Sequence, residues 1–294
     1  MLPRDLARQV RRIQILTSKA VNDVLAGEYH SVFKGQGMEF DEVREYQPGD
    51  DVRTIDWNVT ARTGIPHIKS YVEERELTVF FLVDLSASGY FGSTGRQKNE
   101  VAAELCALLA FSAIRNNDKV GLIIFTDQVE LFIPPRKGAS HVLRLVRELL
   151  YFTPGSTGTN INAALDYFGR IMTKRCVTFL VSDFLAPDFS GSLRIAARRH
   201  DLIAVSMSDP QELELPDVGL LELLDAETGA PLLVDTGSRR VREEYRRNGH
   251  LRREILAASL TSQGADHIPL ITSDDYVLDL VRFFRTRERR RNRA

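Results

Sequence analysis

Residues 78–88 read Thr-Val-Phe-Phe-Leu-Val-Asp-Leu-Ser-Ala-Ser, and this stretch gives the strongest single indication of the fold. Its first six residues are β-branched, aromatic or aliphatic, which is typical of a strand buried on both faces of a parallel sheet. The polar residues Asp84, Ser86 and Ser88 follow directly. We therefore expect a central strand whose carboxyl end leads into a polar loop.

The chain after residue 88 alternates between helical and strand patterns. The spacing of apolar residues predicts helices at 97–115, 139–150, 160–172 and 192–199, and strands at 119–125, 176–181 and 202–207. A strand at 129–133 is expected to form an edge hairpin with 119–125 and to stop at Pro134-Pro135. Strands that alternate with helices through short joins indicate an α/β fold with an open, doubly wound, mostly parallel sheet of the Rossmann-like kind.

Three parts are expected along the chain. Residues 1–76 should hold an N-terminal helix, at 4–25, and a small β-rich segment packed on the core. Residues 77–286 should form the α/β domain, with a less typical extension after about residue 210. That extension is expected to contain a hairpin at 220–235, a charged helix at 238–263, a strand at 266–271 and a last helix through Tyr276 and Phe284. Residues 287–294 form an arginine-rich tail.

The composition is that of an ordinary globular protein. Hydrophobic residues make up 43%, charged residues 27%, and the formal net charge is −1, so no overall field points to nucleic acid or a membrane surface. Cys106 and Cys176 each lie in an apolar run, which favours core thiols over a disulfide or a zinc site. No stretch approaches the roughly 20 apolar residues of a membrane-spanning helix, and we expect a cytoplasmic protein.

Three short segments carry the candidate chemistry. They are the Asp84-to-Ser88 loop, Gly158-Thr159-Asn160 and Ser182-Asp183, and each follows a predicted strand or enters a predicted helix. Ligands of open parallel sheets bind outside the carboxyl ends of the strands, so these segments can converge. Two carboxylates and three hydroxyls form an all-oxygen set that suits Mg²⁺ or Mn²⁺ better than zinc or copper. Two protein carboxylates are too few for tight, closed binding of the ion. A position in its coordination therefore remains for an acidic side chain of a partner.

Each segment also has an ordinary structural explanation. Serine and aspartate are common in turns and at helix N-termini, so Asp84 could simply end a strand. Thr159 or Asn160 could simply cap the helix that follows, and Thr157 is a nearby competitor for the role of Thr159. The three segments in this order, each after the expected element, are much harder to obtain by chance.

The order DxSxS, then GTN, then SD resembles the metal-ion-dependent adhesion site of von Willebrand factor A-type domains. This resemblance implies that Ser86, Ser88 and Thr159 contact the metal, that Asp84 and Asp183 act directly or through water, and that a partner's carboxylate completes the coordination.

One position departs from the adhesion-site pattern. Phe184 stands where many A domains carry glycine, which affects the expected geometry of the loop and therefore its affinity for metal.

A second resemblance lies in residues 35–62, which read GQGMEFDEVREYQPGDDVRTIDWNVTAR. This stretch is similar to the signature of a bacterial "domain of unknown function" family that joins such a segment to an A domain. The matching residues with polar or aromatic side chains include Arg44, Tyr46, Asp50, Asp51, Arg53, Asp56, Trp57 and Arg62. We expect the aspartates and arginines to form an ion-pair network that packs the segment onto the A domain, with Trp57 as its anchor; alternatively, the charges face a partner.

The family resemblance, which extends to about residue 210, also implies a partner. Members are typically encoded beside MoxR-type AAA+ ATPases and are thought to act as adaptors in chaperone-like assembly, maturation or stress systems. The favoured function is therefore a non-catalytic, metal-dependent protein-interaction module that works with such an ATPase or with an acidic side chain of a client protein.

Enzymatic and nucleic-acid functions are the alternatives. The sequence contains no GxSxG, HExxH or GxxxxGK[ST] motif, and Gly155-Ser156-Thr157-Gly158 lacks the lysine of a phosphate-binding loop. Asp84 at a strand end leaves a metal-dependent phosphohydrolase open as an alternative. The arginine-rich tail leaves nucleic-acid binding as a second alternative, although a solvated helix end explains it more simply.

Overall fold

The computed structural model describes residues 29, 32–33, 39–72, 76–224 and 229–291. The predicted helix at 4–25 lies outside these residues. The chain divides into two compact units, of which Phe33–Leu77 is one and the chain from Thr78 onward forms most of the other. Tyr29 belongs to the larger unit, where its buried hydroxyl donates a hydrogen bond to Asp118 Oδ2 at 3.1 Å.

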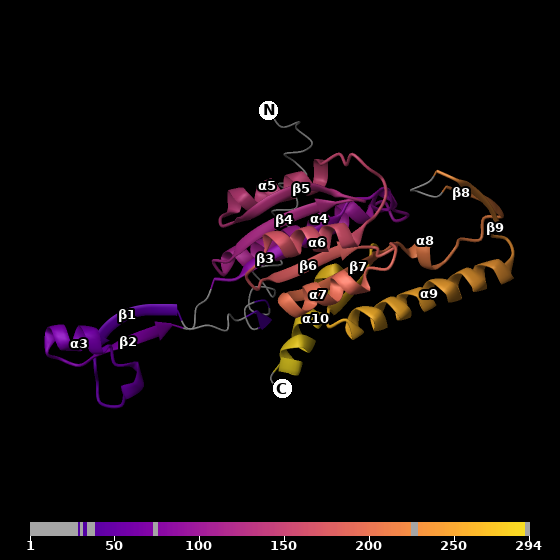
Figure 1. The fold of residues 1–294 in the computed structure, drawn as a ribbon. Helices are drawn as coiled ribbons and strands as arrows, with labels where there is room; N and C mark the ends of the chain where they lie inside the picture. Colours follow the sequence, from indigo (N-terminus) through magenta and orange to yellow (C-terminus); the bar gives the residue numbers. More distant parts are fainter. Residues whose placement is uncertain (1–28, 30–31, 34–38, 73–75, 225–228, 292–294) are drawn as a thin grey trace. The chain divides into compact units, whose positions relative to one another are not determined.

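The larger unit is built around a six-stranded sheet (Figure 1). Its strands are β3 (Thr78–Asp84), β4 (Lys119–Phe125), β5 (Val129–Arg136), β6 (Val177–Ser182), β7 (Asp201–Ser208) and β10 (Asp266–Ile271). They lie in the order β10-β7-β6-β3-β4-β5, and all neighbours are parallel except β4 and β5. The predicted α/β fold with an open, mostly parallel sheet is confirmed.

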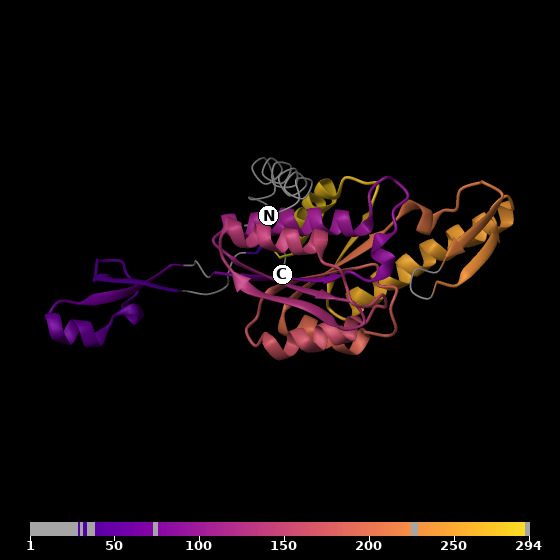
Figure 2. The ribbon, with the colours of Figure 1, turned by 90° about the horizontal axis from the view of Figure 1, so that it is seen from above.

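Helices cover both faces of this sheet (Figure 2). One face carries α4 (Lys98–Arg115) and α5 (Ala139–Tyr151), and the other carries α6 (Ile161–Ile171) and α7 (Ser190–Arg199). Strands β3, β4 and β6 are almost wholly buried, because both of their faces lie under helices. Cys106 and Cys176 are free and buried, as expected of core thiols, and burial raises the pKa of Cys176 to about 11.

Close packing in the centre of the sheet depends on a glycine. Phe80 of β3 and Gly121 of β4 are paired in register, and the Phe80 ring is fully buried between Phe132 and Phe168. A Cβ atom on Gly121 would lie 2.6 Å from the Phe80 ring. The missing side chain of Gly121 therefore provides the space that the ring occupies.

Strand β5 differs from the prediction at its end. It continues through both prolines to Arg136, although the sequence predicted that Pro134-Pro135 would stop it. The pairing with β4 shifts between Val120 and Leu122, opposite the prolines, and β5 forms one edge of the sheet. Proline is tolerated at an irregular position of an edge strand because no further strand needs its missing N–H.

The chain after residue 210 completes the sheet as well as extending it. A helical turn, α8 (Pro210–Leu213), leads to the hairpin β8 (Leu220–Leu224) and β9 (Pro231–Asp235), and then to the long helix α9 (Arg239–Ser262). Strand β10 then pairs with β7 in parallel, and α10 (Tyr276–Arg291) packs against β10. The predicted hairpin, charged helix, strand and last helix are all present.

The smaller unit contains more helix than the sequence suggested. Strands β1 (Glu39–Glu45) and β2 (His67–Val72) form an antiparallel pair, and the connection holds a 3-10 turn (Val52–Thr54) and helix α3 (Trp57–Thr63). Asp56 caps α3 by accepting hydrogen bonds from the backbone of Asn58 and Val59. Gly64 ends the helix with a φ of 76°, a conformation that suits glycine.

Candidate metal site

Strand register brings the first and third predicted segments together. Asp84 ends β3 and Ser182 ends the neighbouring strand β6, and Val83 is paired with Val181 just before them. Ser182 Oγ donates a hydrogen bond to Asp84 Oδ2 at 2.7 Å. The DxSxS loop and the Ser182-Asp183 pair therefore meet at the carboxyl edge of the sheet, as the sequence predicted.

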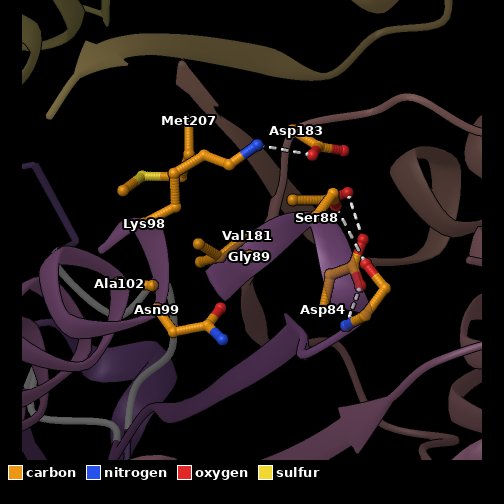
Figure 3. A pocket seen from close by; sticks show the side chains of 11 residues that line it. Asp84, Ser88, Gly89, Lys98, Asn99, Ala102, Val181, Asp183 and Met207 are labelled. Atoms are coloured by element: carbon orange, nitrogen blue, oxygen red, sulfur yellow. Dashed lines mark hydrogen bonds and ion pairs between the residues drawn. The ribbon is translucent and has the colours of Figure 1, made fainter. Parts of the chain in front are cut away.

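The DxSxS loop is held by its own side chains. Ser86 N donates to Asp84 Oδ1 at 2.9 Å, and the hydroxyl oxygens of Ser86 and Ser88 lie 3.2 Å apart (Figure 3). Burial raises the pKa of Asp84 to about 6, and the charge of Asp183 adds to the rise, although hydrogen bonds from Ser182 and Ser86 oppose it. Asp84 is thus a buried carboxylate that forms no ion pair with a cation among the described residues, which favours a cation beside it.

Asp183 lies across the same small pocket. Its Oδ1 accepts a hydrogen bond from Leu185 N at 3.1 Å, and its Oδ2 accepts one from Lys98 Nζ at 2.8 Å. Burial raises the pKa of Asp183, but the charge and hydrogen bond of Lys98 outweigh that effect and hold the pKa below its ordinary value. Ser88 also contributes a hydrogen bond that lowers it.

The loop with Thr159 lies next to this pocket. Ala87 N donates to the carbonyl oxygen of Thr157 at 3.0 Å, which attaches this loop to the DxSxS loop. Asn160 caps α6 by accepting a hydrogen bond from Ala163 N at 3.1 Å, as the ordinary explanation of this segment proposed. Thr159 is not among the described residues that line the pocket, so its role as a ligand stays a prediction.

The pocket is small, and seven of its eleven lining residues carry polar side chains. It is lined by Asp84, Ser86, Ser88, Gly89, Lys98, Asn99, Ala102, Val181, Ser182, Asp183 and Met207, and its volume is about 20 Å³, room for one water-sized particle (Figure 3). Gly89 lets the loop approach α4 closely, because a Cβ atom there would overlap the Asn99 side chain.

The residues of the pocket fit a hard divalent cation. Four of the five predicted ligands present carboxylate or hydroxyl oxygens around a space for one ion, and oxygen donors of this kind suit Mg²⁺ or Mn²⁺. In the described part of the chain, no group of three or more His, Cys, Asp and Glu side chains could hold a metal. The candidate site therefore relies on its hydroxyls and on two carboxylates, which leaves coordination for water or a partner.

Lys98 also lines this pocket, although it was not among the site residues predicted from the sequence. Its side chain is 3% exposed, and Nζ lies 2.8 Å from Asp183 Oδ2 and 2.6 Å from Glu212 Oε1. Burial lowers the pKa of Lys98, but the two carboxylates more than offset this and hold the pKa above its ordinary value. The available signal was a lysine in the first turn of a predicted helix, where the helix dipole disfavours a positive charge.

Phe184, the departure from the adhesion-site pattern, adopts a glycine-like backbone. Its φ is 59°, in the left-handed region that few residues other than glycine, asparagine and aspartate adopt. Its side chain is buried and contacts the Phe189 ring, with 5.6 Å between ring centroids. The loop thus keeps a left-handed turn after Asp183, and core packing compensates for the backbone strain.

The signature residues interact within the smaller unit. Arg44 forms two hydrogen bonds with Asp50, at 2.8 and 2.9 Å, which lower the pKa of Asp50. Asp51 accepts from Arg53.

The remaining signature residues are partly exposed. Asp56 pairs with Lys69 at 3.4 Å, and Tyr46 N donates to the Pro66 carbonyl oxygen. Arg62 lies exposed in the last turn of α3, and Trp57 is 70% exposed, so Trp57 does not anchor a core of its own unit. Packing of this segment on the α/β unit stays a prediction.

The arginine-rich end begins as part of the fold. Helix α10 continues through the expected boundary at residue 287 to Arg291. Arg287 is half-buried and forms ion pairs with Asp201 and Asp266, which joins α10 to the start of β7 and β10. At least this arginine therefore has a structural role, which weakens the case for a free nucleic-acid-binding arm.

Comparison with protein families identifies the chain's relatives. Residues 42–255 match the model of the family described as "Protein of unknown function DUF58", which includes most of the signature segment and most of the α/β unit. The chain belongs to this family. Proteins similar to it include the uncharacterized protein Rv1480 of Mycobacterium tuberculosis strain H37Rv, which is 32% identical over 97% of this chain and 90% of its own length. The uncharacterized protein YeaD of Bacillus subtilis is 23% identical over 58% of this chain and 40% of YeaD.

Solved structures with a similar course of the chain include two proteins of low sequence identity. BatB from Bacteroides thetaiotaomicron has a TM-score of 0.48 at 15% identity, over 72% of this chain and 99% of BatB. The von Willebrand A domain of SpRpn10 has a TM-score of 0.40 at 10% identity, over 70% of this chain and 94% of that domain. None of the helices that the structure describes is long and apolar enough to cross a membrane.

Proposed function

We propose that this DUF58 protein is a non-catalytic, metal-dependent protein-interaction module of the von Willebrand A type. In this proposal Mg²⁺ or Mn²⁺ is held by Asp84, Ser86, Ser88 and Asp183, with Thr159 as the fifth ligand. The observation that carries the proposal is the convergence of these first four residues on one small oxygen-lined pocket at the carboxyl edge of the sheet.

The surface beside the pocket supports binding of a partner. Tyr90 and Phe91 follow the DxSxS loop and are 47% and 41% exposed, and Leu185 follows Asp183 by two residues and is 52% exposed. Exposed aromatic and aliphatic side chains next to an incomplete metal site suit a protein partner that delivers one carboxylate to the metal. A partner would bind there by excluding water from the contact between its carboxylate and the metal, and this binding needs no catalytic group.

The partner in this proposal is a MoxR-type AAA+ ATPase or a client protein of that ATPase, and the expected site of action is the cytoplasm. The support for this partner is the resemblance of residues 35–62 to the signature of the family, whose members are typically encoded beside such ATPases. The ATPase would supply the activity, and this chain would act as the adaptor in an assembly, maturation or stress system.

The test is a pull-down of a MoxR-type AAA+ ATPase from the same organism, in Mg²⁺ and in EDTA. We expect retention in Mg²⁺ and loss of most retention in EDTA or with Asp84→Ala. The matched control is Asp166→Ala, which removes an exposed carboxylate of α6 away from the pocket and should leave retention unchanged. Retention that ignores both EDTA and Asp84→Ala would contradict metal-dependent binding.

The phosphohydrolase alternative is distinguished by turnover. A metal-dependent phosphohydrolase should release phosphate from p-nitrophenyl phosphate or a similar ester with Mn²⁺, and Asp84→Ala should abolish this. We expect no such release from the wild-type chain, since the loop after Asp84 supplies only serines, and the Asp183 carboxylate and Lys98 ammonium group in the same pocket are already paired with each other. The nucleic-acid alternative predicts steeply salt-dependent binding, which we do not expect.

A further inference from the structure

Lys98 brings a positive charge into the pocket that is proposed to bind metal. It is the first residue of α4, and its extended side chain ends at Asp183 (Figure 3). The ammonium group lies between Asp183 Oδ2 at 2.8 Å and Glu212 Oε1 at 2.6 Å, and the side chain is 3% exposed. The pocket therefore contains a cation that belongs to the protein itself.

The surroundings hold this ammonium group in place. Glu212 is fixed by a second contact, since its Oε2 accepts a hydrogen bond from Asp209 N at 2.9 Å within the capping box of α8. Asp209 is fully buried and accepts further hydrogen bonds from Ser93 N and Thr272 Oγ1. A buried lysine at the positive end of a helix is unfavourable unless carboxylates compensate it, and here two carboxylates do so.

The same contact occupies a predicted metal ligand. Both carboxylate oxygens of Asp183 are engaged, Oδ1 by Leu185 N and Oδ2 by Lys98. A divalent ion that uses Asp183 must share this oxygen with the ammonium group or displace it. In either case the ion meets a like charge inside a small, buried pocket, where such repulsion is stronger than in water.

We propose that Lys98 is a resident cation that keeps the affinity of the pocket for divalent metal low, so that metal is held firmly only when a partner adds a further carboxylate. This inference rests on the proposed metal site and deepens it by naming the residue that sets metal affinity. It makes metal binding and partner binding mutually dependent. The partner's carboxylate offsets the positive charge of the metal and Lys98, and the metal provides the cation that the partner's carboxylate binds.

The test is calorimetric titration of the full chain with Mn²⁺ alone. Lys98→Gln removes the charge and keeps a hydrogen-bond donor, and we expect it to lower the dissociation constant for Mn²⁺ by about tenfold or more. The matched control is Lys174→Gln, which removes an exposed lysine that precedes β6, at the end of that strand away from Asp183. It should leave the dissociation constant within about twofold of wild type.

A second pair of variants tests the same inference from the other carboxylate. Glu212→Gln removes one of the two described carboxylates that pair with the ammonium group and leaves Asp183 to hold it, so Mn²⁺ should bind more weakly than to wild type. Glu214→Gln removes an exposed carboxylate two residues away and serves as the control. If Lys98→Gln does not fold, Glu212→Gln and Glu214→Gln test the inference in its place. Equal affinities of these two variants for Mn²⁺ would overturn it.

The outcomes separate this inference from the proposed function. Unchanged or weaker Mn²⁺ binding by Lys98→Gln, with binding that Asp84→Ala abolishes, would overturn the role of Lys98 and leave the metal site standing. In that case Lys98 would position Asp183 as a ligand. Failure of every variant to bind Mn²⁺, including Lys98→Gln, would overturn the metal site and the inference together.

Discussion

The buried carboxylate of Asp84 is expected to destabilise the metal-free fold at neutral pH. Its pKa rises from the ordinary value of 3.8 to about 6, chiefly because burial disfavours the charged form. Each tenfold change in proton affinity is worth about 1.4 kcal/mol, so this rise amounts to about 3 kcal/mol. Asp84→Asn removes the charge but weakens one of the two hydrogen bonds that the carboxylate accepts, at a cost of about 1 kcal/mol. In EDTA at pH 7.5 the variant should therefore be more stable than wild type by about 2 kcal/mol.

The pH dependence gives this expectation a definite sign. Because the pKa of Asp84 is higher in the folded than in the unfolded chain, the folded chain binds more protons between pH 3.8 and about 6. The free energy of unfolding therefore falls as the pH rises through that window, because Asp84 loses its proton in the folded chain. This decrease is complete above the window. The advantage of Asp84→Asn should be full at pH 7.5 and absent near pH 4.

Urea denaturation of both chains in EDTA, followed by circular dichroism at pH 7.5 and pH 4.5, measures the effect. A variant less stable than wild type at pH 7.5, or a difference that does not change with pH, would refute the reasoning. Excess Mn²⁺ should make the wild type more stable than the variant. At 100 times its dissociation constant, Mn²⁺ would stabilise the wild-type fold by about 2.7 kcal/mol, whereas the variant lacks the Asp84 carboxylate that binds the metal. Asp166→Asn, on an exposed carboxylate, is the control that should show neither effect.

Substitutions at three further positions test the packing of the α/β unit by urea denaturation at pH 7.5. Gly121→Ala should destabilise the fold by about 1–3 kcal/mol, because the added methyl group meets the Phe80 ring, and a neutral result would show that this ring has room to move. Phe184→Gly should be more stable than Phe184→Ala by about 1 kcal/mol, because only glycine adopts the left-handed φ without strain; equal stabilities would contradict that conformation. Arg287→Ala should lower the free energy of unfolding by about 1–3 kcal/mol, because it removes the ion pairs with Asp201 and Asp266. An unchanged free energy of unfolding would show that Arg287 behaves as a solvated residue of the tail.

The strands and helices of the α/β unit could be predicted from the sequence because their apolar periods are long and regular. The run 78–83 and the helical pattern of 97–115 match β3 and α4 to within a residue or two. The end of β5 could not be predicted in the same way, since Pro134 and Pro135 stop a strand only where a neighbour needs their N–H groups.

Helix α3 was missed for a different reason. Its seven residues are too few to display an apolar period, and the helix depends on capping by Asp56 and Gly64, whose types also occur in turns.

The candidate site was predictable only as far as its residues follow strand ends. Asp84 and Asp183 could be placed together because their strands were recognised and parallel strands end at one edge. Lys98 and Glu212 could not, because they are 114 residues apart and meet only through the packing of α4 and α8 at that edge. Their contact has no local signature, so it required the tertiary structure.

The order of strands also determines how the sheet grows during synthesis. Strand β3 is made first, β4 and β5 then extend the sheet on one side, and β6, β7 and β10 extend it on the other, one after another. From the completion of β3 until Asp266–Ile271 emerge, the nascent chain therefore exposes the unpaired backbone of a strand that will later be interior. Such edges pair readily with foreign strands, and a chain terminated within the β8–β9 hairpin would keep the edge of β7 open permanently. Premature termination there should therefore yield an aggregating product in place of a shortened but soluble domain.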